Sequence, residues 1–290
     1  MKRQFVSMII GAAVVLASCS EDPENMGSVV FEDDISVAAT ADALFDDIDD
    51  VSEIGVEELQ AVAMKVLPRD RERIGDCAEV TTDREAGTVV IDFGEDGCVG
   101  ADGRLRKGII RITHTGDYGQ PGHSKETSFE NFEIDSIGVE GTRTVTNISD
   151  PSGEDKVSTI TLLGGKLSFP DGTELTRDSE KTRTVFYNEE EEVFQATVFG
   201  VANGMNKDAL QYTHTVDEET PLLFTRACRE MRRVAAVSGI LLIEVEGESD
   251  KIVDFGDGSC DHMVTVTQDG VTTEIEIDPK QTRRRQHRRR

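Results

Sequence analysis

Short runs of alternating apolar and polar residues cover most of the chain after Cys77. They are rich in Val, Ile, Thr and Phe, and turn residues interrupt them about every eight to twelve positions. This spacing is typical of strands joined by tight turns, which makes neighbouring strands antiparallel. We therefore predict a mainly β protein with an antiparallel multi-strand meander over residues 77–278. Because roughly a dozen strands exceed what one flat open sheet usually holds, we expect a sandwich-like body or two related β halves.

The clearest hairpin is predicted near the end of this body. Residues 263–267 and 271–277 have strand composition, and the Asp269-Gly270 pair between them is a preferred hairpin turn. Alternation along the second strand predicts one buried and one solvent-facing side. The predicted buried side carries Val271, Thr273, Ile275 and Ile277.

Residues 37–68, before the β body, carry apolar side chains at helical spacing. Leu44 and Ile48 belong to one such stripe, and a second stripe includes Leu59. Gly55 lies between the stripes and favours a helix end. We predict two short helices that precede the β body.

An acidic run, Asp46-Asp47-Ile48-Asp49-Asp50, lies within the first predicted helix. Its carboxylates are potential calcium ligands. A solvated helix face opposite an apolar stripe explains the same pattern, and this is the interpretation we adopt.

The first residues have the layout of a bacterial secretory signal. Lys2 and Arg3 precede an apolar stretch that is too short for a transmembrane helix, which needs about 20 apolar residues. The stretch ends in Leu-Ala-Ser-Cys at Cys19, which matches the bacterial lipobox. We predict that residues 1–18 are a lipoprotein signal peptide and that Cys19 carries the acyl chains that anchor the protein to a membrane.

Residues 19–36 are polar and acidic at their start, and we predict a flexible tether there. Acidic residues directly after the cysteine resemble the surface-export signal of Bacteroidota-type lipoproteins. This resemblance implies an outer-membrane lipid anchor with exposure at the cell surface.

The chain is strongly acidic, with 57 Asp and Glu against 31 Lys and Arg and a formal net charge of −26. Such a surface repels phosphate, so we expect no nucleic-acid partner. The acids are spread along the whole chain, which favours adaptation to a saline medium over a single cation site. Residues 279–290 are instead rich in arginine, and we expect this tail to be disordered.

Four cysteines remain when Cys19 is set aside. An even number in an oxidising compartment predicts two disulfides, and four cysteines allow three pairings. Similar sequences, each ending in Asp-Phe-Gly, precede the second and the fourth cysteine. We therefore favour the pairs Cys77 with Cys98 and Cys228 with Cys260. A four-cysteine zinc site is the alternative, but the chain has no C-x-x-C spacing.

The repeated Asp-Phe-Gly also suggests an internal duplication. The halves would be residues 77–188 and 193–278, separated by the acidic run 189–192.

Aspartates cluster around glycines near the second repeat, at Asp254, Asp257 and Asp261. A similar acidic group surrounds Cys98, at Asp92, Glu95, Asp96 and Asp102. Oxygen-rich loops of this kind bind calcium, whereas the Asp-Phe-Gly-Asp-Gly string also resembles a structural turn of PKD-type β-sandwich modules. Calcium is the one cofactor that we consider, as the alternative to a structural turn.

The sequence contains no catalytic set that we can identify. Its five histidines, at positions 114, 123, 214, 262 and 287, have neither the H-E-x-x-H motif nor a paired metal-site spacing. A Gly-x-Ser-x-Gly nucleophile elbow is absent, and spacing does not single out a catalytic carboxylate pair among 57 acids. The chain has no Trp and three Tyr, which disfavours an aromatic platform for sugar rings. We expect a non-enzymatic protein.

The β body contains three distinctive motifs. They are Asp-Phe-Gly followed by Gly97-Cys98, Gly-Thr-Arg-Thr-Val-Thr-Asn over 141–147, and Asp-Phe-Gly-Asp-Gly followed by Cys260-Asp261. Together they resemble an uncharacterised family of Bacteroidota-type surface lipoproteins, over nearly the whole mature chain. The resemblance implies the anchor, the β-rich body and the outer location, and it implies no activity. Within 141–147, alternation places Arg143 and Val145 on one strand face and the threonines on the other.

These observations predict a lipid-anchored surface protein whose β body binds or scaffolds an extracellular ligand or protein. A ligand-capture subunit of an outer-membrane uptake system is one alternative. A hydrolase with an unrecognised site is another.

Overall fold

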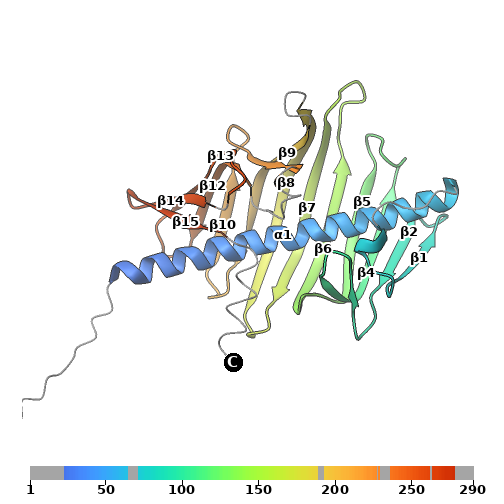
Figure 1. The fold of residues 1–290 in the computed structure, drawn as a ribbon, viewed down its shortest axis with the longest axis horizontal. Helices are drawn as coiled ribbons and strands as arrows, with labels where there is room; N and C mark the ends of the chain where they lie inside the picture. The colour runs from blue at the N-terminus through green and yellow to red at the C-terminus, as the bar shows by residue number, and fades with distance from the viewer. Residues whose placement is uncertain are drawn as a thin grey trace, which may run out of the picture.

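The computed structural model describes residues 23–64, 71–188, 193–226, 228, 236–261 and 263–277, and their side chains except those of 23–34, 36, 38–39, 60–64, 187–188 and 193–194. Within these ranges the chain forms one long helix, a short 3₁₀ helix and a 15-stranded antiparallel sheet (Figure 1). The predicted mainly β, antiparallel meander is confirmed.

The helix α1 spans Pro23–Met64, and the 3₁₀ helix η1 spans Arg71–Arg73. The strands are β1 (Glu79–Asp83), β2 (Thr88–Asp92), β3 (Cys98–Val99), β4 (Leu105–Thr115), β5 (Ser124–Ile134), β6 (Ile137–Asn147), β7 (Lys156–Ser168), β8 (Glu174–Asn188), β9 (Val193–Met205), β10 (Gln211–Val216), β11 (Leu222–Thr225), β12 (Ser238–Val245), β13 (Lys251–Asp257), β14 (Met263–Gln268) and β15 (Val271–Glu276).

The strands belong to one sheet and not to two packed layers. Its order is β1-β2-β4-β5-β6-β7-β8-β9-β10-β12-β13-β14-β15, with β3 paired to β4 and β11 paired to β9 and β12. Register shifts interrupt four successive pairings from β4 to β8. Bulges of this kind increase the local twist. The limit on the number of strands that we applied to a flat open sheet therefore does not hold for this sheet.

The predicted boundary at 189–192 falls between β8 and β9. These two strands pair in register from Asp178 with Asn203 to Asn188 with Val193. The two predicted halves therefore share one continuous sheet at this point.

A single helix crosses the sheet from near β14 and β15 to near β1 (Figure 1). Its 42 residues extend about 63 Å at about 1.5 Å per residue. The thirteen strands along the sheet path extend about 58 Å at about 4.8 Å per strand. The helix is therefore long enough to cover the full width of one sheet face.

The core lies between α1 and this face. The helix buries apolar residues three or four positions apart, including the predicted Leu44, Ile48 and Leu59. Every second residue of the strands faces the helix. Buried strand residues include Val89, Ile91, Ile110, Ile112, Ile134, Leu162, Ile243 and Val253.

The prediction of two short helices is wrong, because α1 continues through Gly55. A Cβ atom at position 55 would lie 3.1 Å from Ile91 Cδ1 and 3.2 Å from the side chains of Ile112 and Val89. The glycine thus allows α1 to pack closely on β2 and β4 and does not end the helix. The predicted tether is also shorter than expected, because the helix begins at Pro23.

The predicted terminal hairpin is confirmed as β14 and β15, which pair around Asp269 and Gly270. Both turn residues have positive φ, 50° and 78°, as a type I′ turn requires. Ile275 and Ile277 are buried as predicted, but Val271 is 66% exposed. It lies next to the turn, and Thr273, which was also predicted to be buried, is exposed as well.

Candidate functional site

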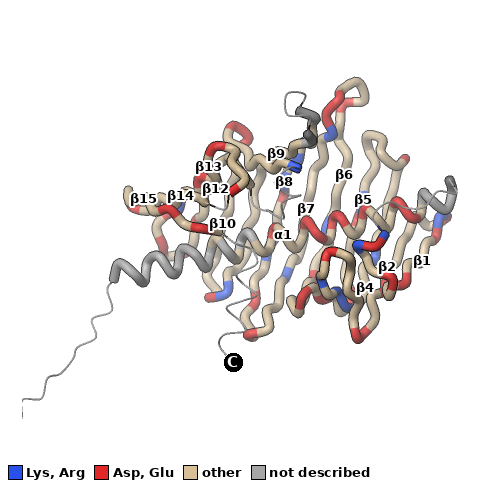
Figure 2. The backbone as a smooth tube through the Cα atoms, in the orientation of Figure 1, with Lys and Arg blue, Asp and Glu red and all other residues tan. Residues whose placement is uncertain are grey.

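Charged side chains of α1 meet basic side chains of the sheet in the middle of the core. Figure 2 shows acidic positions along the part of α1 that crosses the central strands. Four of them, Asp42, Asp47, Asp49 and Glu53, form ion pairs with strand residues. The interface between helix and sheet is therefore partly ionic.

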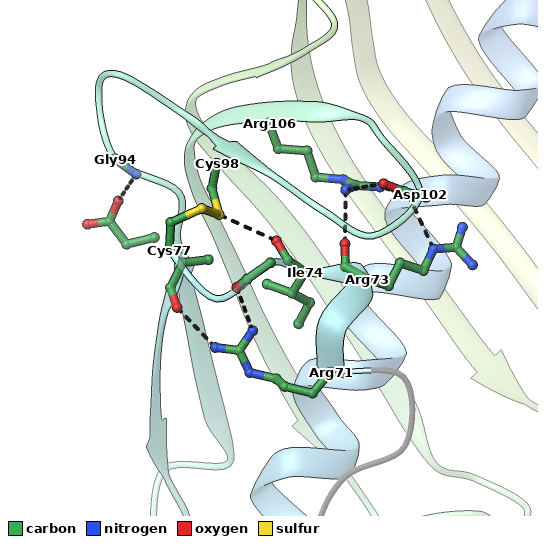
Figure 3. Close-up of a disulfide and its surroundings, with 11 residues drawn as sticks. Arg71, Arg73, Ile74, Cys77, Gly94, Cys98, Asp102 and Arg106 are labelled. Atoms are coloured by element: carbon green, nitrogen blue, oxygen red, sulfur yellow. Dashed lines mark hydrogen bonds and ion pairs between the residues drawn. A yellow bond between two sulfur atoms is a disulfide. The ribbon is translucent and has the colours of Figure 1, made fainter.

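Arg106 of β4 is fully buried at this interface. Its Nη2 atom donates to both carboxylate oxygens of Asp47 at 2.8 Å and to Asp102 Oδ2 at 2.6 Å. Its Nη1 atom donates to the carbonyl oxygen of Arg73 at 3.2 Å (Figure 3). The guanidinium thereby joins α1, η1 and the loop before β4.

Arg143 of β6 forms a bidentate ion pair with Asp49 of α1. The Nε and Nη2 atoms donate to the two carboxylate oxygens, each at 2.7 Å. Burial opposes ionisation of Asp49, but Arg143 outweighs it and holds the pKa of this carboxyl below its usual value of 3.8. The Arg143 side chain is on the helix-facing side of the strand, whereas its alternation with threonines predicted only that Arg143 and the threonines lie on opposite faces.

The interpretation of the acidic run as a solvated helix face is wrong for two of its members. Asp47 and Asp49 are 4% and 8% exposed. Their partners Arg106 and Arg143 are more than fifty positions away in sequence. Local periodicity therefore did not contain the information that these carboxylates are neutralised.

A small cavity lies between α1 and strands β8 to β13. Its volume is about 60 Å³, and it has apolar walls that include Leu222, Phe224, Leu241 and Phe255. A water molecule needs about 10–15 Å³ of such space, so the cavity holds a few waters or the end of a small ligand.

The polar end of this cavity is occupied by ion pairs. Arg177 Nη2 and Lys181 Nζ both donate to Asp42 Oδ1, at 2.8 and 2.7 Å. Burial works against the ionised form of Asp42, but the two cations hold its pKa well below its usual range. Burial and the nearby Arg177 lower the pKa of His214 to about 3. These groups are fixed in one charge state near neutral pH, which does not suit a general acid or base.

A larger groove lies on the opposite face of the sheet, over β9, β10 and β12. Its volume is about 570 Å³, within the usual range of about 300–1,000 Å³ for ligand sites. Asn203, Thr213 and Glu244 lie side by side across the three strands. Met205 and Gln211 form the next row, and Glu246 N donates to Gln211 O.

The polar side chains of this groove are available for a ligand. Asn203, Gln211, Glu244 and Glu246 are exposed, and no described residue hydrogen-bonds their side chains. The groove has two carboxylates and no Lys or Arg in its lining, so it favours neutral or cationic polar molecules over anions. Sequence reasoning missed this site, because its residues come from three strands and share no motif.

The three aspartates of the calcium hypothesis each cap a turn of their own. Asp254 Oδ1 accepts from Gly256 N at 2.9 Å, and Asp257 Oδ1 accepts from Ser259 N at 3.1 Å. Asp261 Oδ1 accepts from Met263 N at 3.1 Å. Among the described residues, no three His, Cys, Asp or Glu side chains form a group that could hold a metal ion. The contacts favour the structural-turn alternative.

The acidic group around Cys98 is also divided among separate contacts. Asp92 Oδ1 accepts from Gly94 N at 2.8 Å (Figure 3). Asp102 is engaged with Arg106, as described above. Glu95 and Asp96 are exposed.

Both predicted disulfides are present. Cys77 is bonded to Cys98, and Cys228 is bonded to Cys260. The first bond lies beside η1, where Arg71 donates to the carbonyl oxygens of Gly75 and Ala78 (Figure 3). It ties the segment before β1 to the short strand β3.

The structure brings together two of the histidines that appear scattered in the sequence. His114 and His123 have ring centroids 5.6 Å apart. They flank a glycine-containing loop between β4 and β5, and their proximity depends on strand register, which the alternation of each strand does not specify. His262 and His287 lie outside the described residues.

The predicted signal peptide, Cys19 and the arginine-rich tail also lie outside the described residues. In the part of the chain that is described, neither helix combines the length and the apolar composition needed to cross a bilayer.

Comparison with models of known families, with curated proteins and with solved structures found no match to this chain.

Proposed function

We propose that this chain is a lipid-anchored lipoprotein of the outer cell surface that binds a polar, neutral or cationic small molecule without catalysis. The outer groove over β9, β10 and β12 carries this proposal, because it combines ligand-sized volume with four exposed polar side chains that have no described partner. The lipobox that ends at Cys19 supports the anchored location.

Binding is favoured over hydrolysis by the charge states of Asp42 and His214 in the cavity under α1. The cavity under α1 contains two carboxylates and a histidine, Asp42, Asp46 and His214. Asp42 is engaged by two cations, and the pKa of His214 is far below neutral pH. The exposed groove has no histidine in its lining.

Binding should be tested by calorimetry with two classes of probe, neutral oligosaccharides and the polyamine spermine. Thr213→Trp places a bulky ring in the middle of the groove and should weaken binding strongly. Thr265→Trp is the matched control, because this exposed threonine lies on β14, away from the groove. The chain has no native Trp, so each variant also gives a single fluorescent reporter.

The two probe classes distinguish the role of the acidic side chains. Glu244→Gln and Glu246→Gln should weaken spermine binding more than oligosaccharide binding, since they remove charge and keep hydrogen-bonding capacity. Failure of both classes to bind, or equal binding by Thr213→Trp and Thr265→Trp, would contradict the proposed site.

A further inference from the structure

His114 and His123 lie on the two sides of the loop between β4 and β5. His114 lies near the end of β4, and His123 directly precedes β5. The ring planes are inclined at 46°, with centroids 5.6 Å apart. Tyr118, in the connecting loop, packs edge-on against His123 at 5.4 Å and donates its hydroxyl hydrogen to Glu53 Oε1 at 2.6 Å.

Three buried ring nitrogens of this pair have no hydrogen-bond partner. They are Nδ1 and Nε2 of His114 and Nε2 of His123. In the described part of the chain only one other buried side-chain polar atom, Arg73 Nε, lacks a hydrogen-bond partner. Buried polar groups are rarely left unsatisfied, because this costs free energy. Their concentration in one histidine pair therefore points to a bound species that contacts both rings.

We propose that His114 and His123 bind one divalent transition-metal ion of the zinc and copper class. Neutral imidazole nitrogen is a preferred ligand of these ions. Metal–nitrogen bonds of about 2.0–2.1 Å place the centres of two ligating rings roughly 5–6 Å apart, and the observed separation falls in this range.

The surroundings determine the character of this site. No third His, Cys, Asp or Glu among the described residues joins the pair, so water completes the coordination. Glu53 supplies a nearby negative charge, although its Oε2 atom already accepts from Lys125 Nζ at 2.9 Å. Tyr118 is 36% exposed, which places the pair beneath a loop in contact with solvent. The site is independent of the outer groove and of the proposed function.

The first test uses the unsubstituted full-length chain in detergent with Cu²⁺ as the probe. We expect an electron paramagnetic resonance spectrum with hyperfine coupling to two imidazole nitrogens at one equivalent of Cu²⁺. A spectrum with oxygen ligands alone would overturn the proposal, since it would show that the ion binds surface carboxylates and that water satisfies the ring nitrogens.

The second test measures Zn²⁺ affinity by calorimetry in single variants. His114→Gln and His123→Gln should each weaken binding roughly tenfold or more, since even outer-shell partners of metal sites contribute about 10–100-fold. His214→Gln and His287→Gln are the controls and should leave the affinity unchanged. Equal affinity in all four variants would overturn the proposal. Circular dichroism establishes that each variant is folded, and the Cu²⁺ spectrum requires no substitution.

Discussion

Arg106 is the largest side chain in the described structure with no exposed surface. Its charge is neutralised by two carboxylates from different elements, Asp47 of α1 and Asp102 of the loop before β4. Such an arrangement is costly to disturb, because removal of one member leaves an uncompensated charge in the core. The stability of the helix–sheet contact therefore depends on this side chain more than on the exposed ion pairs.

Replacement of Arg106 by Met should lower the free energy of unfolding by about 3–5 kcal/mol, because Asp47 then remains buried without its main partner. Urea denaturation followed by circular dichroism measures this change. The control is Arg111→Met on the same strand, whose partner Glu130 is exposed. Its loss should cost about 0–1 kcal/mol. Similar costs for the two variants would show that Arg106 is not an essential neutralising group.

At the scale of elements, α1 is attached through ionised carboxylates whose stability contribution depends on pH. Asp49 is the clearest case, since Arg143 outweighs the effect of burial and lowers its pKa. A carboxyl with a lower pKa in the folded state stabilises the fold above its unfolded pKa. This contribution is lost as the pH falls through the folded value.

We therefore expect the free energy of unfolding to decrease as the pH falls below about 4, where the unfolded state takes up protons before Asp49 does. Asp49→Asn should be less stable than the parent near neutral pH. Its stability should also depend less on pH in the acid range, by up to about 1.4 kcal/mol per pH unit. Urea titrations at several pH values measure both effects. Parallel profiles for parent and variant would contradict the assignment.

The elements also show what the sequence could predict. Alternation and turn residues identified the hairpin of β14 and β15. The apolar stripe identified Leu44 and Ile48 as buried helix residues. Both signals are local in sequence. The helix end predicted at Gly55 was wrong, because a glycine that ends a helix and a glycine that allows close packing look the same in sequence. The burial of Asp49 and the meeting of His114 with His123 depend on strand register, which single-residue patterns do not specify.

At the scale of the whole molecule, the sheet is an open layer with α1 on one face and the groove on the other. Among the described strands, its two edges are β1 and β15. Both edges carry carboxylates, Glu79 and Asp83 on β1 and Glu274 and Glu276 on β15. Like charges on exposed edges oppose edge-to-edge association, which is consistent with the strongly acidic composition.

The proposed anchor lies four positions before the start of α1. Cys19→Ala removes the acylation site, so the protein should move from the membrane fraction to the soluble fraction. Immunoblotting of fractionated cells measures the shift, and Ser20→Ala serves as the control that should stay in the membrane. Retention of Cys19→Ala in the membrane fraction would exclude a lipid anchor at this residue.

The order of elements along the chain also determines the order in which they are synthesised. The helix α1 is made before the sheet. Arg143, the partner of Asp49, lies 94 residues later in the chain, and Lys181, which contacts Asp42, lies 139 residues later. Contacts so distant in sequence form late, since they require closure of long loops. Until these contacts form, we expect the unpaired carboxylates to stay hydrated and to repel other copies of the chain. We therefore expect the acidic residues that hold the folded core together to oppose aggregation before the sheet has formed.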